Sequence, residues 1–388
     1  MKVLLFANTD WYLYNFRLGL ALELQRQGVE VLLVSPDGPY GAKLEARGLR
    51  WIVAPLHRRS LGPLRELRVV TWLWGLLRRE RPDLVHGFTI KCAVYASIAA
   101  RLAGVPARVS AVTGMGYVFT SNDLRARALR PLVRGLMHVA LGGPRKQLVL
   151  QNADDVALFT RSGLIDAASI RLIPSSGVDL TRFRARTTDV PADAPRRVLL
   201  AARLLWDKGI AEFVEAARRL KASGRPLQFQ LAGTIDAGNP ASVPLAAVEG
   251  WIAEGVIQWL GHVDDMPKLF AEVDIVVLPS YREGCPKSLI EAAACGLPLI
   301  TTDVPGCHDV VQHEISGLLV PARDAQCLAD AIARLDDDRA LAQRLGAAAR
   351  ARAMHEYDEQ AVIARTLAVY RELLPQMGAM TDALHSRC

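Results

Sequence analysis

The chain has 388 residues, of which 51% are hydrophobic and 22% are charged. This length suits two domains, and the composition excludes a disordered or fibrous chain. The net charge of +7 is unevenly divided: residues 1–190 carry 27 Lys and Arg against 14 Asp and Glu, and residues 191–388 carry 20 against 26. The asymmetry indicates that the first half meets an anionic membrane, a phosphorylated substrate or nucleic acid, unless its arginines are only solvated.

Apolar, strand-like runs alternate with helical patterns from the beginning of the chain, which predicts parallel sheets covered by helices on both faces, an α/β fold. In the first half these runs are Val3–Ala7, Val29–Ser35, Leu84–His86, Ala107–Val112, Lys146–Leu150 and Ile170–Pro174. The first run is too short for a signal peptide. The longest apolar run, about Val69–Leu77, is too short to span a bilayer, so we expect a chain that is not integral to the membrane.

The polar segment Arg184–Arg197 contains two prolines and is typical of a linker. After it the alternation resumes with Val198–Ala201, Leu227–Ala232, Val256–Leu260, Ile275–Pro279, Leu297–Thr301 and Gly317–Pro321. We therefore predict one domain over residues 1–185 and a second over 191–357. The last ~45 residues look helical, and a C-terminal helix over about 358–388 is expected to pack back on the first domain.

The six cysteines stand at positions 92, 285, 295, 307, 327 and 388, and no two of them have the CxxC spacing. This pattern favours free thiols in a reducing cytosol over a disulfide framework.

Ligands of parallel sheets bind beyond the carboxyl ends of the strands. The segment Asn8–Arg17 follows the first strand and holds no GxGxxG motif, which argues against a dinucleotide-dependent dehydrogenase. After the first strand of the second domain, Arg203 and Lys208 flank a turn into a helix. A guanidinium, an ammonium and a helix N-terminus together suit a diphosphate, although two solvated surface cations would give the same pattern.

A second polar cluster follows the strand that ends at Pro279. Glu283 precedes a turn containing Gly284 and Pro286, a helix begins near Lys287, and Glu291 lies about one turn into that helix. The two carboxylates can face one crevice and accept hydrogen bonds from sugar and ribose hydroxyls. The alternative is that Glu283 caps the helix and that Glu291 is solvated.

These motifs resemble those of the retaining GT-B glycosyltransferases of family 4. The segment Ala202–Gly209 is similar to the family's G-R-L-x-x-x-K-G loop, with Ala202 in place of the common Gly. Pro279–Glu291 matches its P-S-x-x-E-G-x-P pattern, which ends in a second Glu. Ser176–Phe183, Gly296–Gly306 and Glu314–Val320 resemble further family segments. In the first domain the segments that look like the bacterial subgroup acting on polyprenyl-diphosphate-linked glycans are Asn15–Arg17, Phe88–Lys91, Thr113–Phe119 and Gln151–Asp155.

The resemblance implies two Rossmann-like domains with a cleft between them, and it implies roles for single residues. Arg203 and Lys208 would hold the donor diphosphate and act in catalysis together with Glu283, which would contact the transferred sugar. Glu291 would bind the ribose, and the loop near Val263 would lie beside the base. The remaining donor contacts would come from the turn and the helix start, at Gly284, Cys285, Lys287, Ser288 and Leu289.

The family is independent of metals, so no metal site and no cofactor are expected. The scattered His262, His308 and His313 suit structural roles better than metal ligation. Many family members have a His after the strand corresponding to Ala107–Val112, where this chain has Thr113 and Gly114. The candidate acceptor residues are therefore Asp10, Asn15, Arg17, His86, Lys91, Gly114 and Gly116, although His86 could equally be a buried structural histidine.

Together these features predict a retaining glycosyltransferase that moves a hexosamine or hexose from a UDP-sugar to a polyprenyl-diphosphate-linked saccharide. Arginines interleaved with Trp and Leu in 57–81 and 124–146 predict peripheral docking on anionic lipid, at the inner face of the cytoplasmic membrane, unless those helices only carry a core-facing stripe and solvated arginines. The alternatives are a GT-B UDP-sugar epimerase and a non-catalytic nucleic-acid- or membrane-binding protein; we expect no nucleic-acid partner, because no binding module is recognised.

Overall fold

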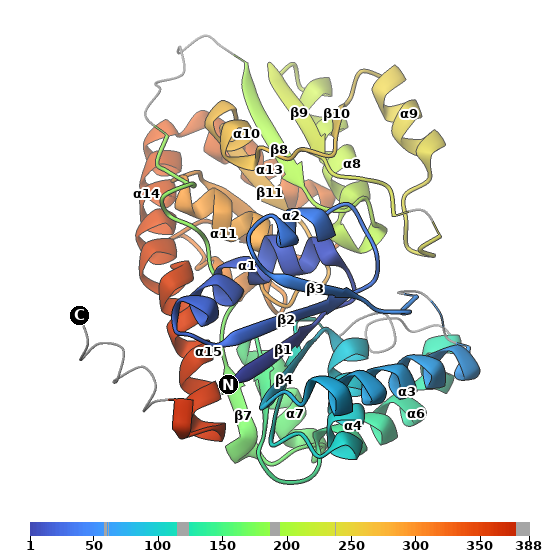
Figure 1. The fold of residues 1–388 in the computed structure, drawn as a ribbon. Helices are drawn as coiled ribbons and strands as arrows, with labels where there is room; N and C mark the ends of the chain where they lie inside the picture. Colours follow the sequence, from blue (N-terminus) through green and yellow to red (C-terminus); the bar gives the residue numbers. More distant parts are fainter. Residues whose placement is uncertain (58–59, 61, 115–123, 187–194, 237, 378–388) are drawn as a thin grey trace, which may run out of the picture. The chain divides into compact units, whose positions relative to one another are not determined.

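The computed structural model describes the whole chain except residues 58–59, 61, 115–123, 187–194, 237 and 378–388. Contacts divide it into two compact units: residues 1–176 with 360–388 form the first, and residues 177–359 form the second. Each unit contains one parallel sheet with helices on both faces, so the predicted α/β class with two Rossmann-like domains is confirmed (Figure 1).

The first unit has a seven-stranded sheet in the order β3-β2-β1-β4-β5-β6-β7, and all of its strand pairs are parallel. The strand order reverses between β1 and β4, which is the arrangement of a doubly wound Rossmann sheet. The strands are β1 (Lys2–Phe6), β2 (Glu30–Ser35), β3 (Arg50–Val53), β4 (Leu84–Phe88), β5 (Ala107–Val112), β6 (Lys146–Leu150) and β7 (Ile170–Leu172).

Successive residues of β1 point to opposite faces of the sheet, and because all of them from Val3 to Phe6 are apolar, helices cover both faces. Val3 and Leu5 pack in a cluster with α1 and α15, whereas Leu4 and Phe6 pack in another cluster with α3 and α4. The helices are α1 (Asp10–Arg26), α2 (Gly41–Glu45), α3 (Pro63–Glu80), α4 (Ile90–Ala103), α6 (Leu124–Leu141), α7 (Ala153–Ser162) and α15 (Glu359–Leu373), with a 3₁₀ turn η1 (Ala167–Ser169).

The second unit repeats this plan with six parallel strands in the order β10-β9-β8-β11-β12-β13. Its strands are β8 (Arg196–Ala201), β9 (Leu227–Ala232), β10 (Gln258–Gly261), β11 (Ile275–Leu278), β12 (Leu299–Thr302) and β13 (Leu318–Val320). Its helices are η2 (Trp206–Lys208), α8 (Ile210–Ala222), α9 (Leu245–Ala253), α10 (Met266–Glu272), α11 (Lys287–Ala294), α12 (Cys307–Val310), α13 (Ala325–Asp337) and α14 (Arg339–Glu356).

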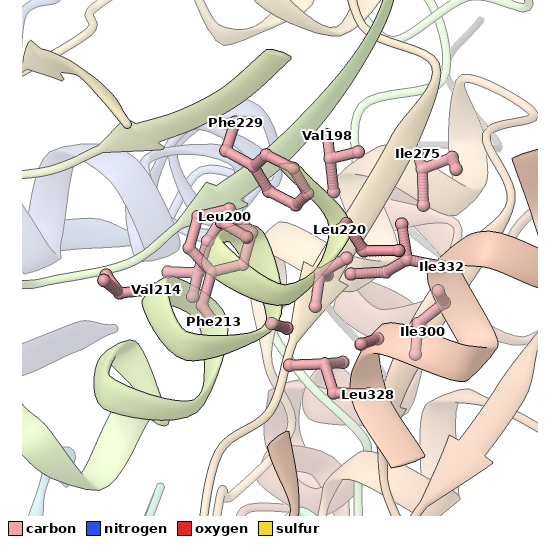
Figure 2. Packing of buried hydrophobic residues seen from close by; sticks show 14 of the residues in the cluster. Val198, Leu200, Phe213, Val214, Leu220, Phe229, Ile275, Ile300, Leu328 and Ile332 are labelled. Atoms are coloured by element: carbon pink, nitrogen blue, oxygen red, sulfur yellow. The ribbon is translucent and has the colours of Figure 1, made fainter. Parts of the chain in front are cut away.

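The core of the second unit is divided by its sheet in the same way. Figure 2 shows Val198 and Leu200 of β8 packed with Phe213 of α8 and Leu328 of α13 on one face. The intervening Leu199 packs on the opposite face with α10 and α11. β8 is therefore buried on both faces, and the loop at its carboxyl end leaves from between two packed clusters.

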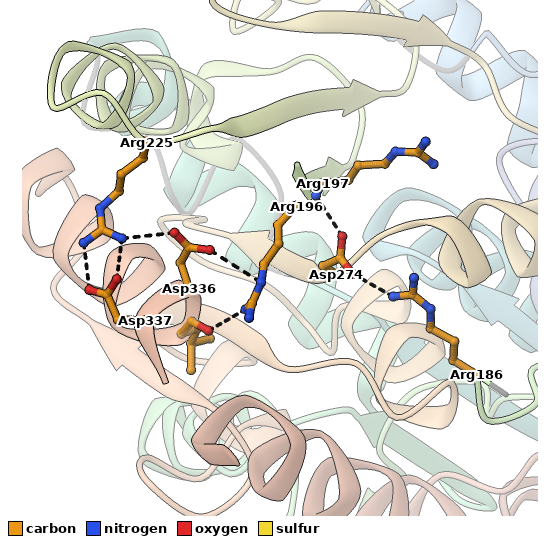
Figure 3. Close-up of polar contacts among 8 residues, drawn as sticks. Arg186, Arg196, Arg197, Arg225, Asp274, Asp336 and Asp337 are labelled. Atoms are coloured by element: carbon orange, nitrogen blue, oxygen red, sulfur yellow. Dashed lines mark hydrogen bonds and ion pairs between the residues drawn. The ribbon is translucent and has the colours of Figure 1, made fainter. Parts of the chain in front are cut away.

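The segment before the second sheet belongs to the second unit, which corrects the predicted domain end at residue 185. Val178 and Phe183 are buried in the cluster that contains α10 and α11. Arg186 donates from Nη1 to the carbonyl of Val273 at 2.7 Å and to Asp274 Oδ1 at 2.9 Å (Figure 3). These contacts place the division between residues 176 and 177.

The predicted strands are all present, and three of them, Ala107–Val112, Lys146–Leu150 and Leu227–Ala232, have the predicted bounds. The edge strand β3 was not predicted. Among the described residues, the cysteines other than the C-terminal one are all free, as expected. No helix among the described residues is long and apolar enough to cross a bilayer.

Candidate functional site

Several predicted donor residues of the second unit lie where the strand order reverses. β8 and β11 are neighbours in the sheet, and the loops that leave their carboxyl ends carry Lys208 and Glu283. Such a reversal opens a crevice beyond the strand ends, and this is where ligands of open α/β sheets bind.

The two loops are held together by backbone contacts. The carbonyl of Asp207 accepts hydrogen bonds from the amide of Tyr281 at 2.9 Å and from the hydroxyl of Ser280 at 3.0 Å. Gly209 has a φ of 72°, and a β-carbon there would lie 2.0 Å from the carbonyl oxygen of Pro279. Only glycine therefore permits this approach, which explains the Lys208-Gly209 pair of the motif.

Lys208 and Glu283 form a close ion pair as a result. The Nζ atom of Lys208 lies 2.5 Å from Glu283 Oε1, and the two side chains are 16% and 13% exposed. The backbone of Glu283 is fixed from a third loop, because its amide donates to the carbonyl of Pro305 at 3.0 Å. The sequence alone leaves open whether Glu283 caps α11; it does not, because the N-cap is Pro286 and no side chain caps this helix.

Arg203 forms a separate ion pair with an acid that lies outside both sequence motifs. Its Nη1 atom donates to Asp236 Oδ2 at 2.9 Å, and the same oxygen accepts from the side-chain amide of Asn239 at 3.2 Å. Asp236 is buried, whereas about half of the Arg203 side chain is exposed. Asp236 lies in the loop after β9, the strand next to β8, so the sheet order brings the pair together.

Glu291 lies on α11, partly buried, and is not the solvated residue of the alternative interpretation. Burial raises its pKa, while the positive charges of Lys287 and Arg182 lower it. Lys287 Nζ is 3.9 Å from Glu291 Oε1, one helical turn away. Burial is the larger effect, so the pKa of Glu291 lies above its ordinary value, and the two cations limit that rise.

The other predicted donor residues cluster around the same helix start. Gly284 and Leu289 are buried, and Cys285 and Ser288 are partly exposed. Burial raises the pKa of the Cys285 thiol, so this group is not an activated nucleophile. Val263 follows β10 and packs against the cluster that contains α11.

The first unit has an equivalent reversal between β1 and β4, and the candidate acceptor residues Asp10 and Lys91 begin the helices that follow these two strands. Asp10 begins α1 and is buried; its carboxylate accepts from the amides of Tyr40 at 2.6 Å and Gly41 at 3.1 Å. It therefore has a clear role in holding the loop after β2. The Asn15 side chain donates to the carbonyl of Trp11.

Arg17 and His86 occupy the interior of the same unit. Arg17 donates to the hydroxyl of Tyr12 at 2.9 Å, and its guanidinium lies 4.4 Å from the ring centre of Phe88. His86 Nδ1 is 2.6 Å from the hydroxyl of Tyr370 on α15. Burial, and secondarily the charge of Arg17, hold the pKa of His86 well below its ordinary value, so the ring is neutral. His86 is therefore the buried structural histidine that the sequence offered as the alternative to an acceptor residue.

Lys91 stands at the beginning of α4, where several acceptors hold it. Its ammonium bonds to a carboxylate oxygen of Glu66 at 2.9 Å and to the carbonyls of His57 and Ser60 at 3.0 and 2.8 Å. Lys91 thus ties α3 and the loop before it to α4. Gly114 follows β5, and Gly116 lies outside the described residues.

Comparisons with known proteins bear directly on this arrangement. A family model described as "Glycosyl transferases group 1" matches residues 195–338, and one described as "Glycosyl transferase 4-like" matches residues 2–141. The chain belongs to the GT-B glycosyltransferases.

Two curated relatives are similar to this glycosyltransferase over most of their length. One is the N,N'-diacetylbacillosaminyl-diphospho-undecaprenol alpha-1,3-N-acetylgalactosaminyltransferase of Campylobacter jejuni, 28% identical over 96% of this chain and 99% of the relative. The other is the UDP-Gal:alpha-D-GlcNAc-diphosphoundecaprenol alpha-1,3-galactosyltransferase of Escherichia coli, 27% identical over 80% of each chain.

Solved structures share the fold of this glycosyltransferase. The sucrose-phosphate synthase of Thermosynechococcus elongatus superposes with a TM-score of 0.78 at 22% identity, covering 97% of this chain and all of that one. A glycosyltransferase from Rickettsia africae superposes with a TM-score of 0.77 at 20% identity, covering 96% and 98% of the two chains.

The motif cations of this glycosyltransferase therefore lie at strand ends, each against a carboxylate. Mobile or exposed lysines would have to be ordered by the substrate, at a cost in entropy. Lys208 is already ordered by Glu283, and Arg203 by Asp236. Such preorganised charges can stabilise negative charge that develops on a bound group.

Proposed function

We propose that this glycosyltransferase moves a hexose or an N-acetylhexosamine from a UDP-sugar to a saccharide carried on a polyprenyl diphosphate, with retention of the anomeric configuration. The observation that carries the proposal is the Lys208–Glu283 ion pair at the carboxyl ends of β8 and β11. Arg203 lies in the same loop after β8 as Lys208. The substrate classes are supported by the two relatives, whose names both specify an alpha-1,3 transfer to a diphospho-undecaprenol-linked sugar.

Arg203 and Lys208 would bind the diphosphate of the donor. When the bond between the sugar and the diphosphate breaks, negative charge grows on the phosphate oxygens, and two fixed cations lower the energy of that state more than they lower the ground state. The N-terminus of α11, which no side chain caps, adds backbone N–H groups that favour an anion.

The two motif carboxylates would hold the rest of the donor. Within the part of the chain that the structure describes, Glu283 accepts from Lys208 through Oε1, which leaves Oε2 available to a sugar hydroxyl. Glu291 would accept hydrogen bonds from the ribose, and the positive charges of Lys287 and Arg182 oppose the rise in its pKa that burial causes. In a retaining reaction the acceptor hydroxyl enters from the face that the diphosphate leaves, so holding the two reactants in register is the main task of the protein.

We propose further that the transfer needs no metal ion, because the two cations supply the positive charge that a divalent ion would otherwise bring to the diphosphate. Removal of divalent ions with EDTA should leave the rate within a factor of about two. A loss of activity that Mg²⁺ or Mn²⁺ restores would refute this part of the proposal.

The acceptor carries a long lipid, so the enzyme would work peripherally at the inner face of the cytoplasmic membrane. That leaflet is rich in anionic lipids, which attract basic protein surfaces. The excess of cations in residues 1–190 supports this assignment. Candidate contacts for the acceptor in the first unit are Arg17, within α1, and Lys91, at the beginning of α4.

The test is a screen of UDP-sugars against a polyprenyl-diphosphate-linked N-acetylhexosamine with a short prenyl chain. Mass spectrometry of the lipid detects the added sugar, and NMR of the product gives the anomeric configuration. We expect one UDP-sugar to be transferred with its α configuration kept. Release of UDP with no added sugar on any acceptor, or conversion of the donor without an acceptor, would favour the epimerase instead.

A further inference from the structure

The helices α3, α4 and α6 of the first unit form one continuous surface. α3 packs on α4 and α4 packs on α6 (Figure 1). The indole nitrogen of Trp74 on α3 donates to the carbonyl of Leu102 at the end of α4 at 3.3 Å, and the neighbouring Arg101 donates to the carbonyl of Val139 on α6. Trp74, Leu102 and Val139 are therefore neighbours across the three helices.

This surface, which we call the α3/α4/α6 face, exposes large apolar side chains. They are between 37% and 84% exposed, and they are Leu64, Leu67, Trp74, Leu102, Leu132, Leu136 and Val139. On α3 the apolar members recur at spacings of three and seven residues, and on α6 at four and three, so on each helix they lie in one stripe.

The exposed stripes are additional to the stripes that build the core. α3 buries a different set, Val69, Leu73, Leu76 and Leu77, and α6 buries Met137, Ala140 and Leu141. The sequence alone left open whether the apolar residues of these helices were only core-facing. These apolar residues are not all core-facing, because α3 and α6 each carry one apolar stripe that is buried and a second that is exposed. Contiguous exposed apolar residues of this size mark a contact surface.

The charge of the same face is one-sided. The exposed cations on it are Arg65, Arg68, Arg78, Arg79, Arg101 and Arg134. The three helices contain two acids, and both are paired within the unit: Glu66 with Lys91 and Tyr95, and Glu80 with Lys2, Arg50 and the neighbouring Arg79. Leucine and tryptophan beside arginine match the boundary between lipid headgroups and acyl chains.

We propose that the α3/α4/α6 face docks the enzyme on an anionic lipid bilayer, with the leucines and Trp74 inserted below the headgroups and the arginines at the lipid phosphates. The inference deepens the proposed function, since a lipid-linked acceptor lies in such a bilayer. It does not depend on the identity of the donor or of the transferred sugar.

The test is co-sedimentation of the full chain with vesicles of phosphatidylcholine, alone or with about 30% phosphatidylglycerol, at low and high salt. Binding should require phosphatidylglycerol and weaken at high salt. The double variant Leu64→Gln/Leu67→Gln should lose most of the binding. Arg65→Gln/Arg68→Gln should weaken it about fivefold for each cation removed.

The matched control is Leu245→Gln/Ile252→Gln on α9 of the second unit, where two exposed apolar residues are accompanied by Glu249 and, at the end of the helix, Glu254. This variant should bind vesicles as the unchanged protein does. Equal binding to vesicles without phosphatidylglycerol, no binding to either, or an equal loss in the α9 variant would overturn the inference.

Transfer to a short-chain, water-soluble acceptor is measured in parallel and separates the two proposals. The α3 variants should keep that activity, because their side chains are exposed and away from the strand ends. If the protein binds anionic vesicles and transfers no sugar to any acceptor, the proposed function fails and the docking face stands. If it transfers sugar to the short acceptor and ignores vesicles, the docking face fails alone.

Discussion

Replacement of Lys208 with methionine is the sharpest single test of the donor site. Methionine keeps most of the length of the side chain and removes the ammonium that lies 2.5 Å from Glu283. The change leaves the sheet and the glycine turn after Lys208 intact, so an effect on turnover reports the charge itself.

Two magnitudes follow from the structure. Removing one preorganised donor from a developing oxyanion lowers turnover by about 10²–10³, or about 3–4 kcal/mol. The stability cost is separate. The side chains of Lys208 and Glu283 are 16% and 13% exposed, which places the pair between a surface pair, worth about 0–1 kcal/mol, and a fully buried one, whose breakage costs about 3–5 kcal/mol. We expect Lys208→Met to destabilise the protein by about 1–3 kcal/mol.

Steady-state kinetics with the UDP-sugar identified by the screen, and urea unfolding, measure the two effects. The control is Lys268→Met, which removes an exposed lysine of α10 in the same unit. In a Glu283→Gln background the stability cost of Lys208→Met should shrink, because no unpaired carboxylate is left behind. The kinetic cost should remain, because the diphosphate still lacks its cation.

A Lys208→Met enzyme that is folded and turns over within about threefold of the unchanged enzyme would refute the assignment. An equally large loss of turnover in Lys268→Met would also refute it. If the stability cost is the same with and without the Glu283 carboxylate, the 2.5 Å contact does not couple the two side chains in solution.

Three further predictions concern other contacts. Arg203→Lys should lower kcat/KM for the donor about tenfold, since a lysine cannot keep its acid partner and also bind two phosphate oxygens; unchanged kinetics would contradict this. Glu80→Gln should lower stability by about 1 kcal/mol at neutral pH. A hydrogen bond from Arg50, above all, lowers the pKa of Glu80 from 4.5 to about 2, so this contribution is present above pH 4.5 and is lost as the pH falls towards 2. The difference between the urea midpoints of the unchanged protein and Glu80→Gln should therefore be smaller at pH 3 than at pH 7. A difference that is the same at both pH values would contradict this prediction. Tyr370→Phe removes the 2.6 Å partner of His86 and should cost about 1–3 kcal/mol in urea unfolding; a cost below about 0.5 kcal/mol would show that the bond is not formed.

Much of the fold can be predicted from the sequence, because buried parallel strands are nearly continuous apolar runs. Ala107–Val112 and Lys146–Leu150 are central strands of this kind. The edge strand Arg50–Val53 could not be recognised as easily: it is short, begins with a charged residue and is only partly buried, so no apolar pattern marks it. The division between the units was also misplaced, since residues 177–186 look like a linker until their contacts with the second core are known.

The candidate site was predictable where its chemistry is local in the chain. Arg203 and Lys208 stand in one short motif, and so do Glu283 and Glu291. Asp236 was missed because its partner, Arg203, is 33 residues away, and only the pairing of β8 with β9 makes them neighbours. Asp10 shows the converse: an acid after a strand suggests a ligand site, but its partners are backbone amides of a loop 30 residues away.

The pairing of each motif cation with its own acid decides how a diphosphate can bind. If the donor had to displace both acids, its affinity would be reduced by the cost of leaving two carboxylates unpaired. The geometry offers another solution, because Arg203 uses one Nη atom for Asp236 and has further N–H groups, and an ammonium has three. Each cation can therefore bridge its acid and a phosphate oxygen at once. The acids then keep the cations in place between turnovers. Further negative charge enters the site only with the donor diphosphate, and it grows as the diphosphate begins to leave.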